Sequence, residues 1–173
     1  MSVGKQTSRF VSSGGLVVGS ALGMAGTFAP SVPVRGLLWG LDGISLVVAT
    51  ALLTIHHFRR GNDVVASGFL VFVAGQSLVL SSAAMELAVS GPVFGAGVGL
   101  WAASLFLLSA PRVAALWVRI VGVVAGTLFL VVAVRLFMGQ ALTAVSEPLP
   151  SYAYPFLVVT LLGWAWERYR GAP

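Results

Sequence analysis

Long apolar segments separated by short polar breaks dominate this sequence. A helix that crosses the hydrocarbon core of a bilayer needs about 20 predominantly apolar residues, with roughly 17–25 tolerated. Several segments of the 173-residue chain meet this requirement. They are residues 10–29, 35–57, 64–86, 92–110, 113–138 and 151–167. We therefore predict an all-α integral membrane protein, a bundle of six transmembrane helices that forms a single membrane domain over residues 1–173.

The breaks between the segments contain residues that end helices. Proline, glycine or both occur in each of them. The breaks are "PSVP" at 30–33, "RRGND" at 59–63, "SGP" at 90–92, "APR" at 110–112 and "GQALTAVSEPLP" at 139–150. The sixth segment is short and contains Pro155, but its end, "GWAWERYR", resembles an aromatic belt followed by positive charge. The segment after the basic start "MSVGKQTSRF" lacks a small-x-small cleavage site, so we expect a mature helix and not a signal peptide.

The composition excludes several classes of protein. Hydrophobic residues make up 58 % of the chain and charged residues 9 %, whereas a soluble domain carries roughly a quarter charged residues. The absence of cysteine excludes disulfides, thiolate metal sites and thiol nucleophiles. The formal net charge is +5, but the ten lysines and arginines are scattered between apolar segments and form no patch. They therefore indicate membrane topology and not nucleic-acid binding.

The distribution of positive charge predicts the orientation. If the N-terminus is cytoplasmic, most basic residues fall on the cytoplasmic side, and only Arg35 and Arg135 fall on the other. The cytoplasmic set is Lys5, Arg9, Arg59, Arg60, Arg112, Arg119, Arg168 and Arg170. We therefore expect a multi-pass protein of the inner (plasma) membrane with both termini in the cytoplasm. Arg59, Arg60, Arg168 and Arg170 are predicted to contact lipid headgroups.

Glycines recur at intervals of four residues, which places them on one helix face. One run is Gly15, Gly19 and Gly23, another is Gly91, Gly95 and Gly99, and the pairs Gly36/Gly40 and Gly122/Gly126 repeat the spacing once. Such faces let helix backbones approach closely in lipid. Two interpretations stay open: close packing inside one bundle, or association of the first two faces with a second copy or another membrane protein.

The chain also shows weak internal repetition and a family resemblance. Gly15, Gly68 and Gly122 recur at intervals of 53 and 54 residues, which suits three pseudo-repeated helical hairpins. With Pro30 ending the first segment, "DGISLVVA" at 42–49 and "SGFLVFVAG" at 67–75, the chain resembles the HdeD-type acid-resistance membrane proteins of bacteria. The "PSYAYPF" stretch departs from that pattern. The resemblance implies a small envelope protein linked to stress, with no established chemistry.

One carboxylate lies within an apolar segment. Asp42 is seven residues into the second segment, and a charge at such depth is costly, so it is a functional hypothesis by default. We expect it to face the bundle interior with Gln76 as its hydrogen-bond partner. Asp42, Gln76 and Glu86 would then line a polar, ion-binding cavity open to the outside, with Trp39 and Trp101 as apolar walls. The alternative is a structural aspartate, protonated or hydrogen-bonded to Ser45 or a neighbouring helix.

The polar stretch "LLTIHHFRRGND" contains both histidines. His56 and His57 point about 100° apart on a helix, so they cannot bind one metal ion from one face. No third histidine and no cysteine completes a metal site. We expect a membrane-interface role, with pH sensing as the alternative, and we expect no metal or other cofactor.

The sequence contains no serine–histidine–acid set, phosphate-binding loop or HExxH motif, so we do not expect an enzyme. The leading hypothesis is a small non-enzymatic envelope protein, related to stress or accessory to other membrane proteins, that acts through helix–helix association. The alternative is a small channel or a proton- or cation-coupled transporter that uses the region of Asp42, Gln76 and Glu86.

Overall fold

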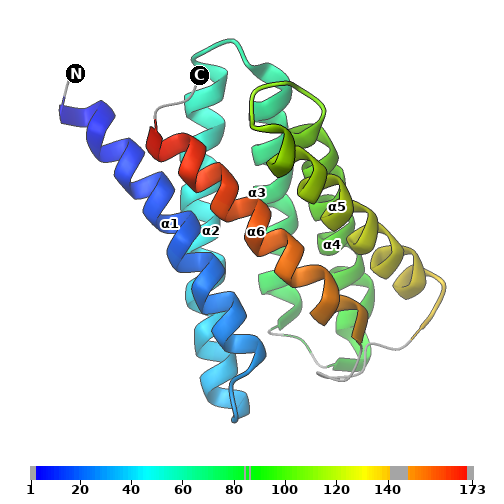
Figure 1. Cartoon of the computed structure of the whole chain (residues 1–173). Helices are drawn as coiled ribbons and strands as arrows, with labels where there is room; N and C mark the ends of the chain where they lie inside the picture. The colour runs from blue at the N-terminus through cyan, green and yellow to red at the C-terminus, as the bar shows by residue number, and fades with distance from the viewer. Residues whose placement is uncertain (1–2, 84, 86, 141–147, 171–173) are drawn as a thin grey trace.

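The computed structural model is entirely helical over the residues it describes, which are 3–83, 85, 87–140 and 148–170. Its helices are α1 (Val3–Thr27), α2 (Val32–Phe58), α3 (Asp63–Ala83), α4 (Leu87–Ser109), α5 (Leu116–Phe137) and α6 (Pro148–Arg170). The all-helical fold is confirmed, and the number of helices agrees with the prediction. Figure 1 shows both marked chain ends at the end of the bundle where the α2–α3 turn and the α4–α5 loop also lie.

The helices form a closed arrangement. Each packs against the next one in the sequence, and α6 packs against both α5 and α1 (Figure 1). Buried aromatic side chains fill much of the space between them. Trp101 of α4 stacks on Phe72 of α3, with ring centroids 5.8 Å apart, and meets Phe129 of α5 edge-on at 5.2 Å. All three side chains are at most 5 % exposed.

Among the described residues, all helices except α6 are long and apolar enough to cross a membrane. These spans are Gln6–Thr27, Val32–Phe58, Asp63–Ala83, Ser90–Ser109 and Leu116–Phe137. Many of their apolar side chains point outward, including Leu37 at 62 % and Ile44 at 61 % exposure. An outward apolar surface of this extent suits lipid as the surrounding solvent.

Two predicted boundaries are wrong because proline does not end its helix. The structure begins α4 at Leu87, five residues before the predicted start, and carries Pro92 inside the helix. It begins α6 at Pro148, three residues before the predicted start, so Pro148 and Pro150 of the predicted break belong to that helix. Proline lacks one backbone donor, but helices in membranes tolerate it where neighbouring groups satisfy the freed carbonyl. Elsewhere the termini differ from the prediction by a few residues, apart from the seven-residue earlier start of α1.

Most of the glycine faces are used inside this chain. A Cβ added at Gly15 would lie 2.9 Å from the Ala49 Cβ of α2, and one at Gly19 would meet Leu46 of the same helix. Gly99 of α4 lies against Ala133 of α5, with 3.5 Å between the two Cβ positions. The first of the two interpretations, packing within one bundle, therefore describes these positions.

The pseudo-repeat is only partly visible in the packing. Gly15 and Gly68 each lie against the second helix of their own hairpin, since a Cβ at Gly68 would be 2.9 Å from Leu108 of α4. Gly122 of α5 lies instead nearest to Ser109 at the end of α4. The third hairpin thus departs from the pattern of the first two.

Candidate functional site

A buried carboxyl group lies between α1, α2 and α6. Asp42 is 5 % exposed, so the prediction that it faces the interior is confirmed. The hydroxyl of Tyr154, from α6, donates a hydrogen bond to the Oδ2 atom of Asp42 over 3.3 Å. The Oδ1 atom of Asp42 is buried and has no hydrogen-bond partner among the described residues. One carboxyl oxygen is therefore satisfied and the other is free.

The small residue at position 23 makes room for this pair. A Cβ on Gly23 of α1 would overlap the Tyr154 hydroxyl and lie 2.9 Å from the Asp42 Oδ2 atom. One turn earlier, a Cβ on Gly19 would be 3.3 Å from the backbone oxygen of Asp42. The glycine run of α1 thus packs α1 against α2 and also leaves space for a polar contact between helices.

Trp39 lies at the edge of the same site. Its Nε1 donates to the backbone oxygen of Gly23 over 3.3 Å, and Thr27 donates to the same oxygen over 3.0 Å. Trp39 is 38 % exposed, and the guanidinium of Arg35 lies 5.8 Å from its ring centroid. Its indole holds α2 to α1 by the hydrogen bond to Gly23, and its predicted role as a cavity wall stays a prediction.

The prediction of a hydrogen bond between Asp42 and Gln76 is wrong, since the described residues include both side chains and show no such bond. Gln76 is 2 % exposed in α3, but its Oε1 atom has no hydrogen-bond partner there. Asp42 instead lies on the face of α2 that meets α1 and α6, whereas the neighbouring Gly43 packs against Leu80 of α3. Because adjacent helical residues point about 100° apart, only one of the two could face α3. Ser45 is not a partner either, since its hydroxyl donates to the Leu41 carbonyl over 2.7 Å.

The other predicted site residues are not gathered around Asp42. Trp101 belongs to the aromatic stack of α3, α4 and α5, and its Nε1 is buried without a described partner. Glu86 lies outside the described residues. The residues predicted to line one cavity therefore lie in two separate places. Asp42 and Trp39 lie where α2 meets α1 and α6, whereas Trp101 lies between α3 and α5.

Tyr154 is the residue that sequence reasoning missed. It is 112 positions from Asp42, and no local spacing connects the two. The available signal was the stretch "PSYAYPF", which places two tyrosines at the start of a helix that is otherwise apolar. Only the packing of α6 against α1 turns that stretch toward Asp42.

The two histidines differ in environment. His57 is 4 % exposed and stacks on Phe69 of α3 at 5.7 Å, with Trp164 of α6 edge-on at 5.8 Å. Its Nδ1 atom has no partner among the described residues. His56 points outward, and its Nε2 lies 3.3 Å from the Arg60 Nη1 atom. His57 is packed inside the bundle near the end of α2, and its role at the membrane interface stays a prediction.

The predicted lipid contacts lie at the helix ends. Arg59 and Arg60 are exposed just after α2, and Arg170 is exposed with its guanidinium 4.3 Å from the Trp166 ring centroid. Arg168 is half-buried and donates to the Ser12 hydroxyl of α1 over 3.3 Å. Three of the four are thus free to meet headgroups, while Arg168 also holds α6 to α1.

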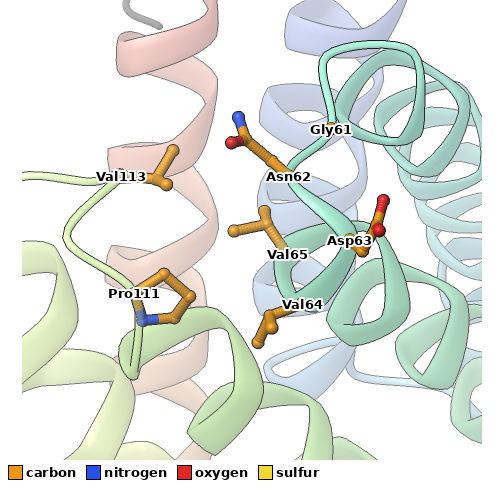
Figure 2. Close-up of a pocket in the computed structure, with 7 residues that line it drawn as sticks. All are labelled: Gly61, Asn62, Asp63, Val64, Val65, Pro111 and Val113. Atoms are coloured by element: carbon orange, nitrogen blue, oxygen red, sulfur yellow. The ribbon is translucent and has the colours of Figure 1, made fainter.

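A shallow surface pocket of about 220 Å³ lies between the α2–α3 turn and the α4–α5 loop. Figure 2 shows its lining residues, Gly61, Asn62, Asp63, Val64, Val65, Pro111 and Val113. The Asp63 carboxylate points away from Pro111 and Val113 in this view. One amide and several apolar side chains provide no catalytic or metal-binding arrangement, so the pocket is a weaker candidate than the Asp42 site.

Within the described residues, no three histidine, aspartate or glutamate side chains lie close enough to hold a metal ion. Comparison of the chain with known protein families, curated proteins and solved structures found no match. The chemistry of the site therefore has to be inferred from its own geometry, in which one buried carboxyl has a single phenolic donor and a free oxygen.

Proposed function

We propose that all the helices of this chain, α6 included, cross the inner (plasma) membrane with both termini in the cytoplasm. With its 23 residues, α6 extends over about 35 Å at 1.5 Å per residue, and it packs between α1 and α5. Its last turn carries Trp166, Tyr169 and two arginines, as expected where a span meets headgroups. The excess of lysine and arginine at the end that holds both termini supports the orientation.

Cysteine labelling tests this topology on a background that contains no cysteine. A single cysteine at Asn62 should react with an impermeant maleimide only after the membrane is opened, whereas one at Gln140 should react in intact cells. Labelling of the Asn62 variant from outside would overturn the proposed orientation.

We infer that the protein binds and releases a proton, or binds a small cation, at Asp42. The observation that carries this proposal is the buried carboxyl group with one oxygen hydrogen-bonded to Tyr154 and the other free. An isolated aspartate near the centre of a span costs roughly 2.5–3.5 kcal/mol on insertion scales. Protonation of the free Oδ1 atom removes that charge while Oδ2 still accepts from Tyr154.

Proton flux into proteoliposomes, followed with an entrapped pH dye, tests the role of Asp42. The wild type should carry flux, Asp42→Asn should abolish it while the protein stays folded in detergent, and Asp63→Asn should leave it unchanged. Asp63 is the matched control because it is an aspartate in the first turn of α3, at the helix end. Wild-type flux in Asp42→Asn, or no flux above empty liposomes in the wild type, would refute the proposal.

A second candidate function, an accessory protein that acts by helix association, is favoured by one observation. A Cβ added at Gly36 or Gly40 of α2 meets nothing within 4 Å, and the exposed Leu37 and Ile44 lie beside them. This face suits a partner helix. In that case Gly36→Ile with Gly40→Ile should change the assembly state in detergent, whereas Asp42→Asn should not. The HdeD-type resemblance is compatible with either role.

A further inference from the structure

Three arginines from three different parts of the chain meet at the end of the bundle that holds both termini. Arg9 lies in α1, Arg60 follows α2, and Arg168 lies in the last turn of α6. Arg168 donates from its Nε to the Ser12 hydroxyl, which brings the end of α6 against α1. At the end of α2, the His57 ring lies 5.8 Å from the ring of Trp164, which is one helical turn before Arg168. These contacts bring Arg9, Arg60 and Arg168 to one place, where the charges of Arg9 and Arg60 act on Arg168.

This cluster has no anionic partner among the described residues. The hydrogen-bond partners of Arg168 and Arg60 there are the neutral side chains of Ser12 and His56. The Nε of Arg9 is buried and has no hydrogen-bond partner within the part of the chain that the structure describes. Glu167, next to Arg168 in sequence, points instead to the start of α5, where it accepts from the backbone nitrogen of Ala115 over 3.3 Å.

The arrangement is unfavourable without a bound anion. Like charges close together repel, and the repulsion grows where protein and lipid replace water. Arg9 and Arg168 are half-buried, and the Nε of Arg9 has lost its contact with water without gaining a protein acceptor. A group with several anionic oxygens would satisfy these donors and reduce the repulsion together.

We propose that Arg9, Arg60 and Arg168 form a binding site for a phosphate group, supplied by the headgroup of an anionic phospholipid of the cytoplasmic leaflet. Guanidinium groups bind phosphate oxygens in a bidentate manner. Basic pockets between membrane helices on the cytoplasmic side bind such headgroups. This site differs from a general attraction of the surface to lipid because it needs residues from α1, α2 and α6 together.

The neighbouring aromatic residues favour a lipid as the source of the phosphate. Phe10 and Tyr169 are the sequence neighbours of Arg9 and Arg168, and their rings meet edge-on at 6.2 Å across the α1–α6 boundary. They are 50 % and 54 % exposed, so they offer an outward apolar surface directly beside the cluster. Aromatic rings are enriched at the level where headgroups meet acyl chains.

Thermal unfolding of the full-length protein in nanodiscs tests the site, because a ligand that binds only the folded state raises the unfolding temperature. Nanodiscs of phosphatidylcholine are compared with nanodiscs that also contain phosphatidylglycerol, and native mass spectrometry counts retained lipids. The variants are Arg9→Gln and Arg168→Gln. The control is Arg112→Gln, which removes the same charge from an exposed arginine before α5, outside the cluster.

We expect phosphatidylglycerol to stabilise the wild type and the Arg112→Gln protein and to remain bound after delipidation. In either cluster variant its apparent affinity should fall by about tenfold or more, the loss expected when charge-assisted bonds are removed. Stabilisation of the phosphatidylcholine sample by inorganic phosphate would support the phosphate site and assign it to a soluble ligand. No wild-type stabilisation by either anion, or equal losses in Arg112→Gln and the cluster variants, would overturn the proposal.

Discussion

Two regions of this bundle use glycine for different purposes. Where α3 crosses α4, a Cβ on Gly75 would lie 2.8 Å from the carbonyl oxygen of Gly97, and one on Gly97 would lie 3.0 Å from that of Gly75. Backbone meets backbone there. Where α1 meets α2 and α6, Gly23 instead leaves room for the side chains of Asp42 and Tyr154. The first crossing is packed by shape alone, and the second holds a polar contact.

The two regions do not differ in whether buried polar atoms lack partners. The α3–α4 crossing borders the aromatic stack of Phe72, Trp101 and Phe129. The Trp101 Nε1 and Gln76 Oε1 atoms there are buried without a described partner. The α1–α2–α6 region keeps a carboxyl oxygen without a described partner. A buried acceptor left unpaired costs about 1–3 kcal/mol. Both regions therefore carry this cost, and the second differs because its unpaired oxygen belongs to an ionisable group that can take up a proton.

The largest effect is expected from truncation of the aromatic stack. Trp101→Ala removes a side chain that touches α3 and α5 at once and leaves a cavity, so unfolding in detergent should become easier by about 3–5 kcal/mol. The control is Trp117→Ala on α5, because Trp117 is 48 % exposed. Similar losses in both variants would mean that the stack is not the stabilising element of this region.

A somewhat smaller effect is expected where backbones meet. Gly75→Ala places a methyl group against a carbonyl oxygen that cannot move without shifting α4, so it should destabilise the protein by about 3 kcal/mol. Gly36→Ala is the matched control, since a Cβ there meets nothing within 4 Å. Denaturant unfolding followed by tryptophan fluorescence measures both. A Gly75→Ala protein as stable as the control would show that the helices separate easily.

In the α1–α2–α6 region, replacement of a glycine by alanine should cost less stability, and it should also affect the Asp42 site. Gly23→Ala would displace the end of the Tyr154 side chain, which can move more easily than backbone, so the loss should be about 1–2 kcal/mol. The proposed proton flux should fall with it, because Tyr154 no longer reaches Asp42. Unchanged flux with reduced stability would separate the tyrosine from the function of Asp42.

The smallest effect is expected from removal of a single hydroxyl group. Tyr154→Phe deletes the donor to Asp42, and hydrogen bonds between membrane helices contribute about 0.6 kcal/mol on average. Tyr152→Phe is the control on the same helix, since Tyr152 is 68 % exposed. Thermal unfolding should distinguish the two variants only slightly. A loss of several kcal/mol would show that the Asp42–Tyr154 pair is mainly a structural clamp.

Much of the fold follows from the sequence because membrane spans are set by length and hydrophobicity. A run of about 20 apolar residues has few alternatives to a helix in lipid, where each backbone group needs an internal partner. The helical segments and most turns could therefore be predicted. Gly61, with a φ of 73°, lies in the turn between α2 and α3, within the predicted "RRGND" break. The starts of α4 and α6 could not be predicted, because whether a helix tolerates Pro92, Pro148 and Pro150 depends on neighbouring groups.

The site was less predictable than the fold. That Asp42 would be buried follows from the cost of exposing a carboxylate to lipid, and its 5 % exposure agrees. Its partner depends on which face of α2 meets which helix, and periodicity along one chain segment does not contain that information. Gln76 was the nearest polar candidate in sequence, whereas Tyr154 is the partner in space.

The sequence by itself indicated lipid as the surroundings of the helices, the positions of the helical segments and the asymmetry of positive charge. These features depend on the composition of contiguous stretches. Only the tertiary structure decided that α6 closes the bundle between α5 and α1. That closure brings Tyr154 to Asp42 at one end and Arg168 to Ser12 at the other. Both contacts join residues more than 100 positions apart, and helix rotation and crossing are set by packing between helices, which no local pattern records.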